Sequence, residues 1–314
     1  MSALIFNWLT YYLGLYVVLD LIFNILKNLS AFVKDKYRPL EFLHTYGKRS
    51  YVVITGASDG LGKCYAFAFA KKGFNLILIA RNKAKLEKVQ SEIKALHPRC
   101  EIHLAVKDFT KSFEPGFFDS IQELSDNFDV SIVVNNVGIS GFGTPFLNGV
   151  LTKIDLPVVA NTVAVNMVAQ ASFHRIFSTR MNSRPSRSAF IDVSSEMSDI
   201  YLPTAETYAA TKDANRFLTN ALASSLRKPN IDYLSHVCGA THTNFFHGSM
   251  DDPFYAQKSD MVVDHELKSL GFLNESRGTP VHTILGCSAN TLFGALALPL
   301  EALLSVVAKI FLKI

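Results

Sequence analysis

A tyrosine and a lysine four positions apart, Tyr208 and Lys212, are the residues whose spacing points most directly to chemistry. If they lie in a helix, they share one face. The positive charge of the lysine favours ionisation of the phenol, whose unperturbed pKa is about 10. A phenol tuned in this way gives a proton to a carbonyl oxygen, or takes one from an alcohol, near neutral pH. The pair alone is a weak signal, because this spacing arises often by chance on solvated helices.

A glycine-rich turn lies far upstream, between residues 55 and 62. It follows a β-branched run at 51–54, which predicts a strand, and precedes an apolar stretch at 63–70, which predicts a helix. Glycines there let the backbone approach a pyrophosphate, and the helix N-terminus attracts its negative charge. This order favours a dinucleotide-binding turn over an ordinary turn with three glycines. The residues expected to contact the dinucleotide are Thr55, Gly56, Ser58, Asp59, Gly60, Leu61 and Gly62.

The same chain carries Asn135-Asn136-Val137-Gly138, Asn166 and Ser195. In this order and at these spacings, the residues resemble the short-chain dehydrogenase/reductase family, strongly over roughly residues 48–245. One branch of that family is similar in three respects: the motif T-G-A-S-D-G-L-G-K, the variant N-N-V-G and an apolar N-terminus. That branch holds the microsomal 17β-hydroxysteroid dehydrogenases and the very-long-chain 3-oxoacyl-CoA reductases.

The resemblance implies catalytic roles for four residues. In the family the tyrosine donates the proton in reduction, the lysine also binds the nicotinamide ribose, and the serine holds the carbonyl oxygen. The asparagine organises a water beside the lysine. These roles fall on Tyr208, Lys212, Ser195 and Asn166, with Ser195 preferred to Ser194 because it lies thirteen residues before Tyr208. A polar side chain merely satisfied in the core is the alternative for Asn166.

The resemblance also implies further cofactor contacts. Asn135 ends a predicted strand, and Gly138 permits a tight turn beside the cofactor. Asp108 matches an adenine-contacting aspartate, with a helix cap as the alternative. Gly239 and Thr243 keep their places in the family's P-G-x-V-x-T stretch, although the proline is replaced by Cys238. We expect Thr243 to reach the carboxamide, in a loop that is less rigid without proline.

The residues after the second predicted strand bear on the choice between NADPH and NADH. Arg81 stands there, with Lys85 one turn later, and a guanidinium suits a 2′-phosphate. Many NADPH enzymes of the family have a basic residue where this chain has Asp59, but the microsomal branch shares that aspartate. We therefore expect NADPH.

Taken with the branch, these residues imply NADPH-dependent reduction of a ketone on a lipidic substrate. A very-long-chain 3-oxoacyl-CoA of fatty-acid elongation is the leading substrate, and a 17-ketosteroid is the alternative. A non-catalytic NADP-binding membrane protein is the further alternative, which the intact set of catalytic residues disfavours. A homodimer or partners from an elongation complex are possible assemblies.

Alternating apolar runs predict an α/β fold, a Rossmann-type doubly wound parallel sheet with the cofactor at the carboxyl ends of its strands. The predicted strands are 51–54, 75–80, 101–106, 131–135, 189–193 and 231–237. The predicted helices are 61–72, 83–95, 117–126, 157–181, 206–227 and about 253–270.

Composition excludes several classes of protein. The net charge is +4 and no long basic run is interleaved with aromatics, which argues against nucleic-acid binding. The four cysteines are scattered without a paired spacing, as expected in a reducing compartment. The nine histidines likewise lack the spacing of metal ligands, so no metal is expected.

Both ends of the chain are apolar. Residues 3–26 carry Asp20 as their only charge, and four basic residues follow within 27–38. A helix of that length spans a hydrocarbon core of about 30 Å, and downstream basic residues favour a cytosolic catalytic domain. An amphipathic helix lying on the membrane is the alternative. The segment 283–314 contains a shorter apolar run, which predicts a membrane-associated segment or a subunit-interface helix.

The predicted organisation has four parts. Residues 1–33 form the membrane anchor, 34–49 a linker, 50–282 the catalytic domain, and 283–314 the C-terminal apolar segment. A substrate lid is expected at about 240–280. The predicted location is the endoplasmic reticulum membrane, with the catalytic domain facing the cytosol.

Overall fold

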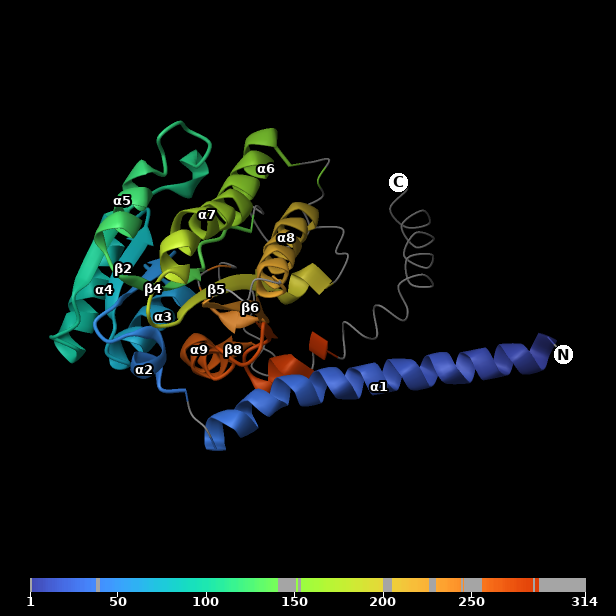
Figure 1. Ribbon diagram of the computed structural model, residues 1–314. Helices are drawn as coiled ribbons and strands as arrows, with labels where there is room; N and C mark the ends of the chain where they lie inside the picture. The colour runs from blue at the N-terminus through green and yellow to red at the C-terminus, as the bar shows by residue number, and fades with distance from the viewer. Residues whose placement is uncertain are drawn as a thin grey trace.

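The fold is built around a seven-stranded parallel sheet with the strand order β3-β2-β1-β4-β5-β6-β9 (Figure 1). The computed structural model describes residues 2–37, 40–140, 151, 154–199, 205–225, 230–243, 245, 256–284 and 286–287. The strands of the sheet are β1 Tyr51–Thr55, β2 Asn75–Ala80, β3 Ile102–Val106, β4 Val130–Asn135, β5 Ser188–Ser195, β6 Ile231–Cys238 and β9 Glu275–Ser276.

Strands β1 and β4 pair with each other at the centre of the sheet, and the strand order reverses between them. In open parallel sheets a ligand binds at this switch point, beyond the carboxyl ends of the strands. The prediction of a Rossmann-type doubly wound sheet is therefore confirmed. The glycine turn, which follows β1, and the end of β4 both lie at this switch point.

Helices cover both faces because alternate residues of each buried strand point to opposite sides. On β1, Val52 and Ile54 pack in one core with α3, α4 and α9, whereas Val53 packs in the other with α5 and α7. Helix α8 lies on the second face, against β5 and β6. The helices are α3 Gly60–Lys71, α4 Lys83–Leu96, α5 Asp119–Asn127, α6 Leu156–Val163, α7 Ala169–Asn182, α8 Glu206–Ala223 and α9 Ser259–Leu267.

Several elements differ from the sequence prediction. The single helix expected over 157–181 is interrupted by a π-helical segment, η3 Ala164–Val168, between α6 and α7. The seventh strand, β9, was not predicted. The helix expected over about 253–270 is observed as α9, preceded by the short strand β8 Gln257–Lys258, which pairs with β7 Thr241–His242. Residues 253–255 of that expected helix lie outside the described part of the chain.

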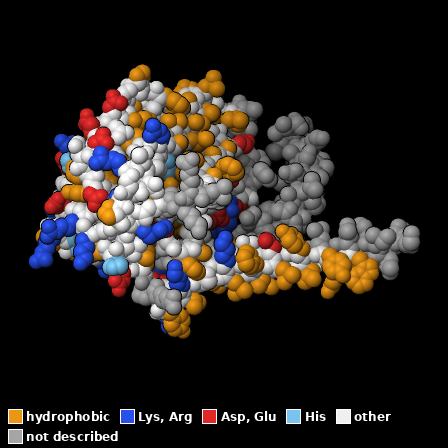
Figure 2. Space-filling model, in the orientation of Figure 1, with side chains coloured by type: hydrophobic (Ala, Val, Ile, Leu, Met, Phe, Trp, Pro, Cys, Tyr) orange, Lys and Arg blue, Asp and Glu red, His pale blue; other side chains and the backbone are white. Residues whose placement is uncertain are grey.

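The N-terminal helix α1, Ser2–Tyr37, projects from the domain (Figure 1). Its stretch Gly14–Tyr37 is long and apolar enough to cross a membrane, a test that the core segment Leu156–Asn182 also passes. Orange side chains follow the projecting helix in Figure 2. The most exposed large apolar side chains described on it are Tyr11, Tyr12, Tyr16, Phe23, Leu26, Val33 and Tyr37.

The region predicted as a linker, 34–49, contains regular structure. Helix α1 continues to Tyr37, and a short helix, α2 Phe42–Tyr46, packs Phe42 and Tyr46 into the core. The segment predicted to associate with the membrane at the C-terminus falls mostly outside the described residues.

Candidate active site

The four predicted catalytic residues come together at the carboxyl end of the sheet. Ser195 is the last residue of β5, Tyr208 and Lys212 lie on the first turns of α8, and Asn166 lies in the π-helical segment. All four are buried, with 1% to 7% of each residue exposed. Helix α8 packs against β5, which brings the tyrosine to the serine.

The side chains of Tyr208 and Ser195 are hydrogen-bonded to each other. Burial raises the pKa of the Tyr208 phenol, the Ser195 hydrogen bond opposes that rise, and nearby Cys238 adds to it. The phenol therefore keeps its proton at neutral pH, as a proton donor requires. The sequence led us to expect that Lys212 lowers this pKa, but burial dominates here.

The ammonium of Lys212 donates to the carbonyl oxygen of Val193, with an Nζ–O distance of 2.8 Å. Burial lowers its pKa to about 8, against the opposing influence of Cys238 and Asp192. The lysine is thus mostly charged at pH 7. A Cβ on Gly138 would lie only 3.3 Å from this Nζ, which explains a glycine at that position.

Asn166 ties the end of β4 to α8. Its Oδ1 accepts from the Ile139 amide at 2.9 Å, and its Nδ2 donates to the Ile139 carbonyl at 3.0 Å and to Thr211 Oγ1 at 3.0 Å. Its carbonyl oxygen accepts from Asn215 Nδ2 at 2.9 Å. Single π-helical turns often occur at functional sites, and here the turn presents a polar side chain within an apolar helix.

The glycine turn is packed so closely on the β4 end that side chains would not fit. A Cβ on Gly62 would collide with the Gly56 carbonyl oxygen, and a Cβ on Gly56 would lie 2.8 Å from Asn136 Nδ2. Gly56 and Gly60 have φ angles of +65° and +51°, which favour glycine. This bare backbone at the start of α3 fits a pyrophosphate. Ser58 and Leu61 are half-buried beside it.

Thr55 and Asn136 hold the turn in place. Thr55 Oγ1 accepts from the amides of Asn136 and Val137 at 2.9 and 3.0 Å, and Asn136 Nδ2 donates to the Thr55 carbonyl at 2.9 Å. Asn136 was quoted in the sequence motif but was not among our expected cofactor contacts. Asn135, which was, turns inward instead and donates to Asp192 at 2.7 Å.

Three charged residues near β2 bear on the choice of cofactor. Lys85 and Asp59 form an ion pair, and Arg81 lies apart from that pair. Lys85 Nζ lies 3.1 Å from an Asp59 carboxylate oxygen, and Asp59 also caps α3 by accepting from the Gly60 amide at 2.8 Å. Arg81 is exposed just after β2, and it forms no ion pair within the described residues. The Asp59 carboxylate therefore offsets the positive charge of Lys85. Of the two cations, Arg81 is the better placed to bind a phosphate.

Three other predicted contacts differ in how well the structure supports them. Asp108 caps the short helix η1 Phe109–Lys111, accepting from the Thr110 amide and hydroxyl at 3.1 and 2.9 Å, so the capping alternative holds. Thr243 borders the glycine turn, since a Cβ on Gly60 would lie 3.2 Å from its methyl. Gly239 is packed between Glu196 and His282.

Asp192 is a buried polar centre that sequence reasoning missed. It is fully buried on β5, three residues before Ser195, and accepts from Asn135 and from Thr219, each at 2.7 Å. Its other contact is His174 Nε2 at 2.9 Å. An aspartate inside a strand of otherwise apolar character was the available signal, because a buried carboxylate needs such partners.

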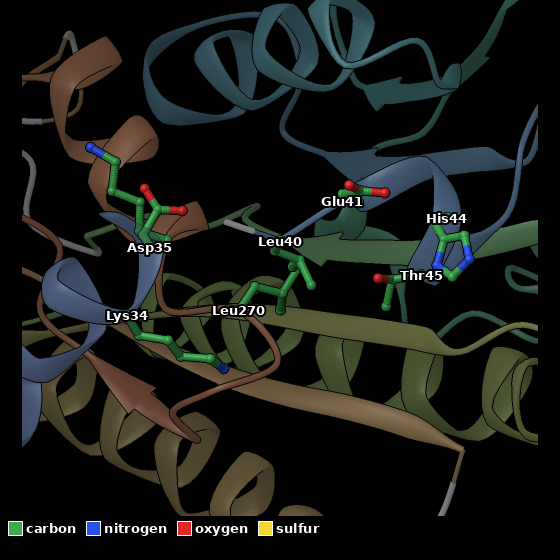
Figure 3. A pocket seen from close by; sticks show the side chains of 8 residues that line it. Lys34, Asp35, Leu40, Glu41, His44, Thr45 and Leu270 are labelled. Atoms are coloured by element: carbon green, nitrogen blue, oxygen red, sulfur yellow. The ribbon is translucent and has the colours of Figure 1, made fainter. Parts of the chain in front are cut away.

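A separate cavity of about 300 Å³ lies toward the amino ends of the strands (Figure 3). It lies between the end of α1, helix α2 and Leu270. Helix α2 precedes β1 in the chain, and Leu270 precedes β9. Figure 3 shows Leu40 and Leu270 side by side at its centre, with charged side chains around them. This cavity is therefore distinct from the candidate active site.

Comparisons with known proteins agree with this geometry. The model of the short chain dehydrogenase family matches residues 50–253. A very-long-chain 3-oxoacyl-CoA reductase of Vanderwaltozyma polyspora is 33% identical over 212 residues, which are 66% of this chain and 60% of that protein's length. The Caenorhabditis elegans protein named "Putative steroid dehydrogenase 1" is 25% identical over 88% of this chain and 87% of its own.

Solved structures show the same fold. A short-chain dehydrogenase from Sphingobium yanoikuyae in complex with NADPH has a TM-score of 0.65 at 22% identity, covering 82% of this chain and 95% of its own. The family match covers well over half of the chain and includes the glycine turn, Ser195, Tyr208 and Lys212. The chain therefore belongs to the short-chain dehydrogenase family and is a nicotinamide-dependent oxidoreductase.

Proposed function

We propose that this protein is an NADPH-dependent reductase of a ketone on a lipidic substrate, acting at a membrane. The observation that carries the proposal is the buried group of Ser195, Tyr208, Lys212 and Asn166 at the carboxyl end of the sheet, together with a glycine turn at the start of α3 whose close packing excludes side chains.

In the proposed reaction, Tyr208 is the general acid. Its buried, protonated phenol gives its proton to the carbonyl oxygen, and the Ser195 hydroxyl donates a hydrogen bond to the same oxygen. Lys212 keeps a positive charge beside the phenol, which stabilises the phenolate left behind. Asn166 holds the β4 end and α8 in register, which keeps the donor aligned. The bound nicotinamide would supply the hydride.

The cofactor would be held by the bare backbone of the glycine turn, with its pyrophosphate at the start of α3. Gly138 leaves space next to Lys212, and Thr243 closes the other side of the turn. Arg81 would pair with a 2′-phosphate, because Lys85 is already engaged by Asp59. This difference between the two cations supports NADPH over NADH.

The leading substrate is a very-long-chain 3-oxoacyl-CoA, as in fatty-acid elongation. Relatives with that name from three fungi are 30% to 33% identical over the matched segments. A 17-ketosteroid is the second candidate, because the Caenorhabditis elegans relatives named as steroid dehydrogenases match up to 88% of the chain. Both are apolar molecules, which suits an enzyme beside a membrane.

The exposed apolar surface of α1 supports a location on the endoplasmic reticulum membrane with the catalytic domain in the cytosol. Lys27, Lys34 and Lys36 lie towards the domain end of this helix, which supports that orientation. Assembly as a homodimer, or with other enzymes of chain elongation, belongs to the same proposal.

The decisive experiment is NADPH consumption by the purified full-length protein with 3-oxoacyl-CoA and with steroid 17-ketones in parallel. We expect turnover of at least one class, with the Tyr208→Phe protein as a matched blank. Cofactor binding without turnover of either class would favour the alternative of a non-catalytic NADP-binding membrane protein.

A further inference from the structure

Five charged side chains form a largely buried cluster directly behind Ser195. They come from η4 Glu196–Asp199, which follows Ser195, from α8, and from β9 with the residue after it. Their exposed fractions run from 4% for the Arg277 side chain to 24% for that of Glu275. The members of this cluster are Glu196, Asp199, Arg216, Glu275 and Arg277.

Asp199 joins three parts of the fold within this cluster. It binds Arg277 Nη2 at 2.6 Å, and it also forms a short contact with Arg216 Nη1. Arg216 makes a bidentate pair with Glu275, at 2.7 and 2.8 Å. The turn after Ser195, the helix that carries Tyr208 and the seventh strand are thus connected through two guanidinium groups.

The turn itself is attached to the catalytic serine. The Met197 amide donates to Ser195 Oγ at 3.2 Å, and Ser198 Oγ donates to the Ser195 carbonyl at 2.6 Å. A shift of η4 would therefore move the Ser195 hydroxyl, which must face the same oxygen as Tyr208.

Two glycines allow the segment after β9 to close on this cluster. A Cβ on Gly239 would lie 2.8 Å from Glu196 Oε2, and a Cβ on Gly286 would collide with Glu196 Oε1. The same Cβ on Gly286 would lie 2.8 Å from Arg277 Nη1, which is itself 3.8 Å from Glu196 Oε1. The charged cluster therefore lies between the loop after β6 and the chain at 286.

We propose that Arg277 is a positioning residue for the reduction: through Asp199 and Glu196 it holds the turn after Ser195, and so keeps the Ser195 hydroxyl facing Tyr208. The inference rests on the proposed function and extends the working site to the segment 275–287. It gives a role to the seventh strand, because Arg277 directly follows it and Glu275 within it pairs with Arg216 of α8.

An arginine suits this position because two carboxylates lie at different nitrogens of one guanidinium, Asp199 at 2.6 Å from Nη2 and Glu196 at 3.8 Å from Nη1. A lysine keeps the charge but has a single compact head, so it satisfies one carboxylate at a time. We therefore expect Arg277→Lys to retain more activity than Arg277→Met.

The test measures steady-state reduction and amide hydrogen exchange on the full-length protein in detergent. Arg277→Met should lower kcat about 10- to 100-fold, the scale expected when a reacting group is misplaced by about 1 Å. The KM for NADPH should change less than kcat, because the nearest atoms that a Cβ on Gly56, Gly60 or Gly62 would meet belong to none of the five cluster residues. Exchange should become faster in the peptide 193–199 and stay unchanged at 51–62.

Arg184→Met is the matched control. Its side chain is 8% exposed and pairs bidentately with Asp129 at 2.7 and 3.0 Å, just before β5 and β4 begin. It therefore removes a guanidinium of similar side-chain exposure at the amino ends of two central strands, away from the candidate active site. It should lower the melting temperature without lowering kcat.

If Arg277→Met does not fold, Gly286→Ala serves as the second variant, because it keeps every charge and displaces Glu196 and Arg277. Unchanged kcat and unchanged exchange at 193–199 in a folded variant would overturn the proposal, as would equal kcat losses in Arg277→Met and Arg184→Met. If the wild-type protein reduces no ketone, the proposed function fails, and the exchange of peptide 193–199 alone decides whether Arg277 positions the turn.

Discussion

Tyr208 and Lys212 are both buried, yet burial moves their pKa values in opposite directions, because protonation leaves the phenol neutral and the amine charged. The pKa of Tyr208 rises, while that of Lys212 falls to about 8. At pH 7 both groups therefore carry their protons. This is the protonation state that reduction of a ketone needs at the start of each turnover.

Replacing Tyr208 with Phe removes the proton donor and keeps the ring that packs against Phe245, 5.9 Å away between centroids. We expect reduction to fall by about 10²- to 10⁴-fold, the usual contribution of general acid catalysis. Binding of NADPH, followed by the change in its fluorescence, should stay nearly intact. A variant that retains more than half of the wild-type turnover would rule out Tyr208 as the donor.

Replacing Arg81 with Asp should move cofactor preference from NADPH towards NADH, because a carboxylate repels a 2′-phosphate and accepts from a 2′-hydroxyl. We expect the ratio of the two kcat/KM values to change by at least about 10-fold, equivalent to about 1.4 kcal/mol. Lys83→Asp is the control, since it reverses an exposed charge at the start of α4. If the ratio is unchanged in Arg81→Asp, another cation holds the phosphate or NADPH was never preferred.

At the scale of elements, the long strands and helices were predictable because their periodicity extends over many residues. The strand at 75–80 was predicted with its observed bounds, and the others differ mainly at their ends. Strand β9 has two residues and pairs with β6 over Ser235 and His236 only, which is too short for any pattern. The π-helical turn at Asn166 leaves the apolar pattern unchanged, so sequence alone gives no sign of it.

In the candidate site, too, some residues are recognisable from the sequence and others only from the structure. The side chains that do chemistry stand out by type and spacing, and the structure brings Ser195 and Tyr208 into direct contact. The groups that support them are polar residues inside apolar segments, such as Asp192 and Arg277. Their partners come from distant parts of the chain, and only the folded arrangement shows which buried donor meets which acceptor.

A buried pair between α9 and β6 gives the fold its own pH dependence. Glu266 is fully buried, and burial raises its pKa to about 8. Its neighbour His236 lies 3.8 Å away and also contacts the Tyr65 hydroxyl at 2.9 Å. Burial, together with His282 and Lys212, lowers the pKa of His236 to about 3.

The two groups act in opposite directions on the free energy of unfolding. Between pH 4.5 and about 8 the folded state keeps the Glu266 proton that the unfolded state loses, so stability falls as pH rises. Between about 3 and 6.5 the unfolded state protonates His236 and the folded state does not, so stability rises with pH. Of this pair, only Glu266 acts between pH 6.5 and 8.

We therefore expect the melting temperature, followed by circular dichroism, to fall from pH 6.5 to 8 in the wild-type protein. Glu266→Gln should flatten this slope, because an amide has no proton to lose. Asp264→Asn is the control, since that side chain is 70% exposed on the same helix and should leave the slope unchanged. Equal slopes in the wild type and Glu266→Gln would show that Glu266 is ionised in the folded protein.

At the scale of the whole molecule, α1 divides into a projecting part and a part fixed to the domain. Ala31 is fully buried in the core, and Lys34 Nζ lies 4.0 Å from the centroid of the Phe272 ring. The exposed aromatic and aliphatic side chains lie mainly before these contacts. A truncation that tests the anchor should therefore end before Ala31, so that the domain keeps its own contacts.

We expect protease added to sealed microsomes to digest the domain that holds Tyr208, because the basic residues lie on the domain side of α1 and favour the cytosol. Removing residues 1–27 should leave a folded protein that salt releases only in part, since the apolar stretch 284–312 would still hold it to lipid. Protection of the domain in intact microsomes would place the enzyme in the lumen. Complete solubility of the truncated protein would mean that the C-terminal stretch packs on protein, and that α1 alone holds the enzyme at the membrane.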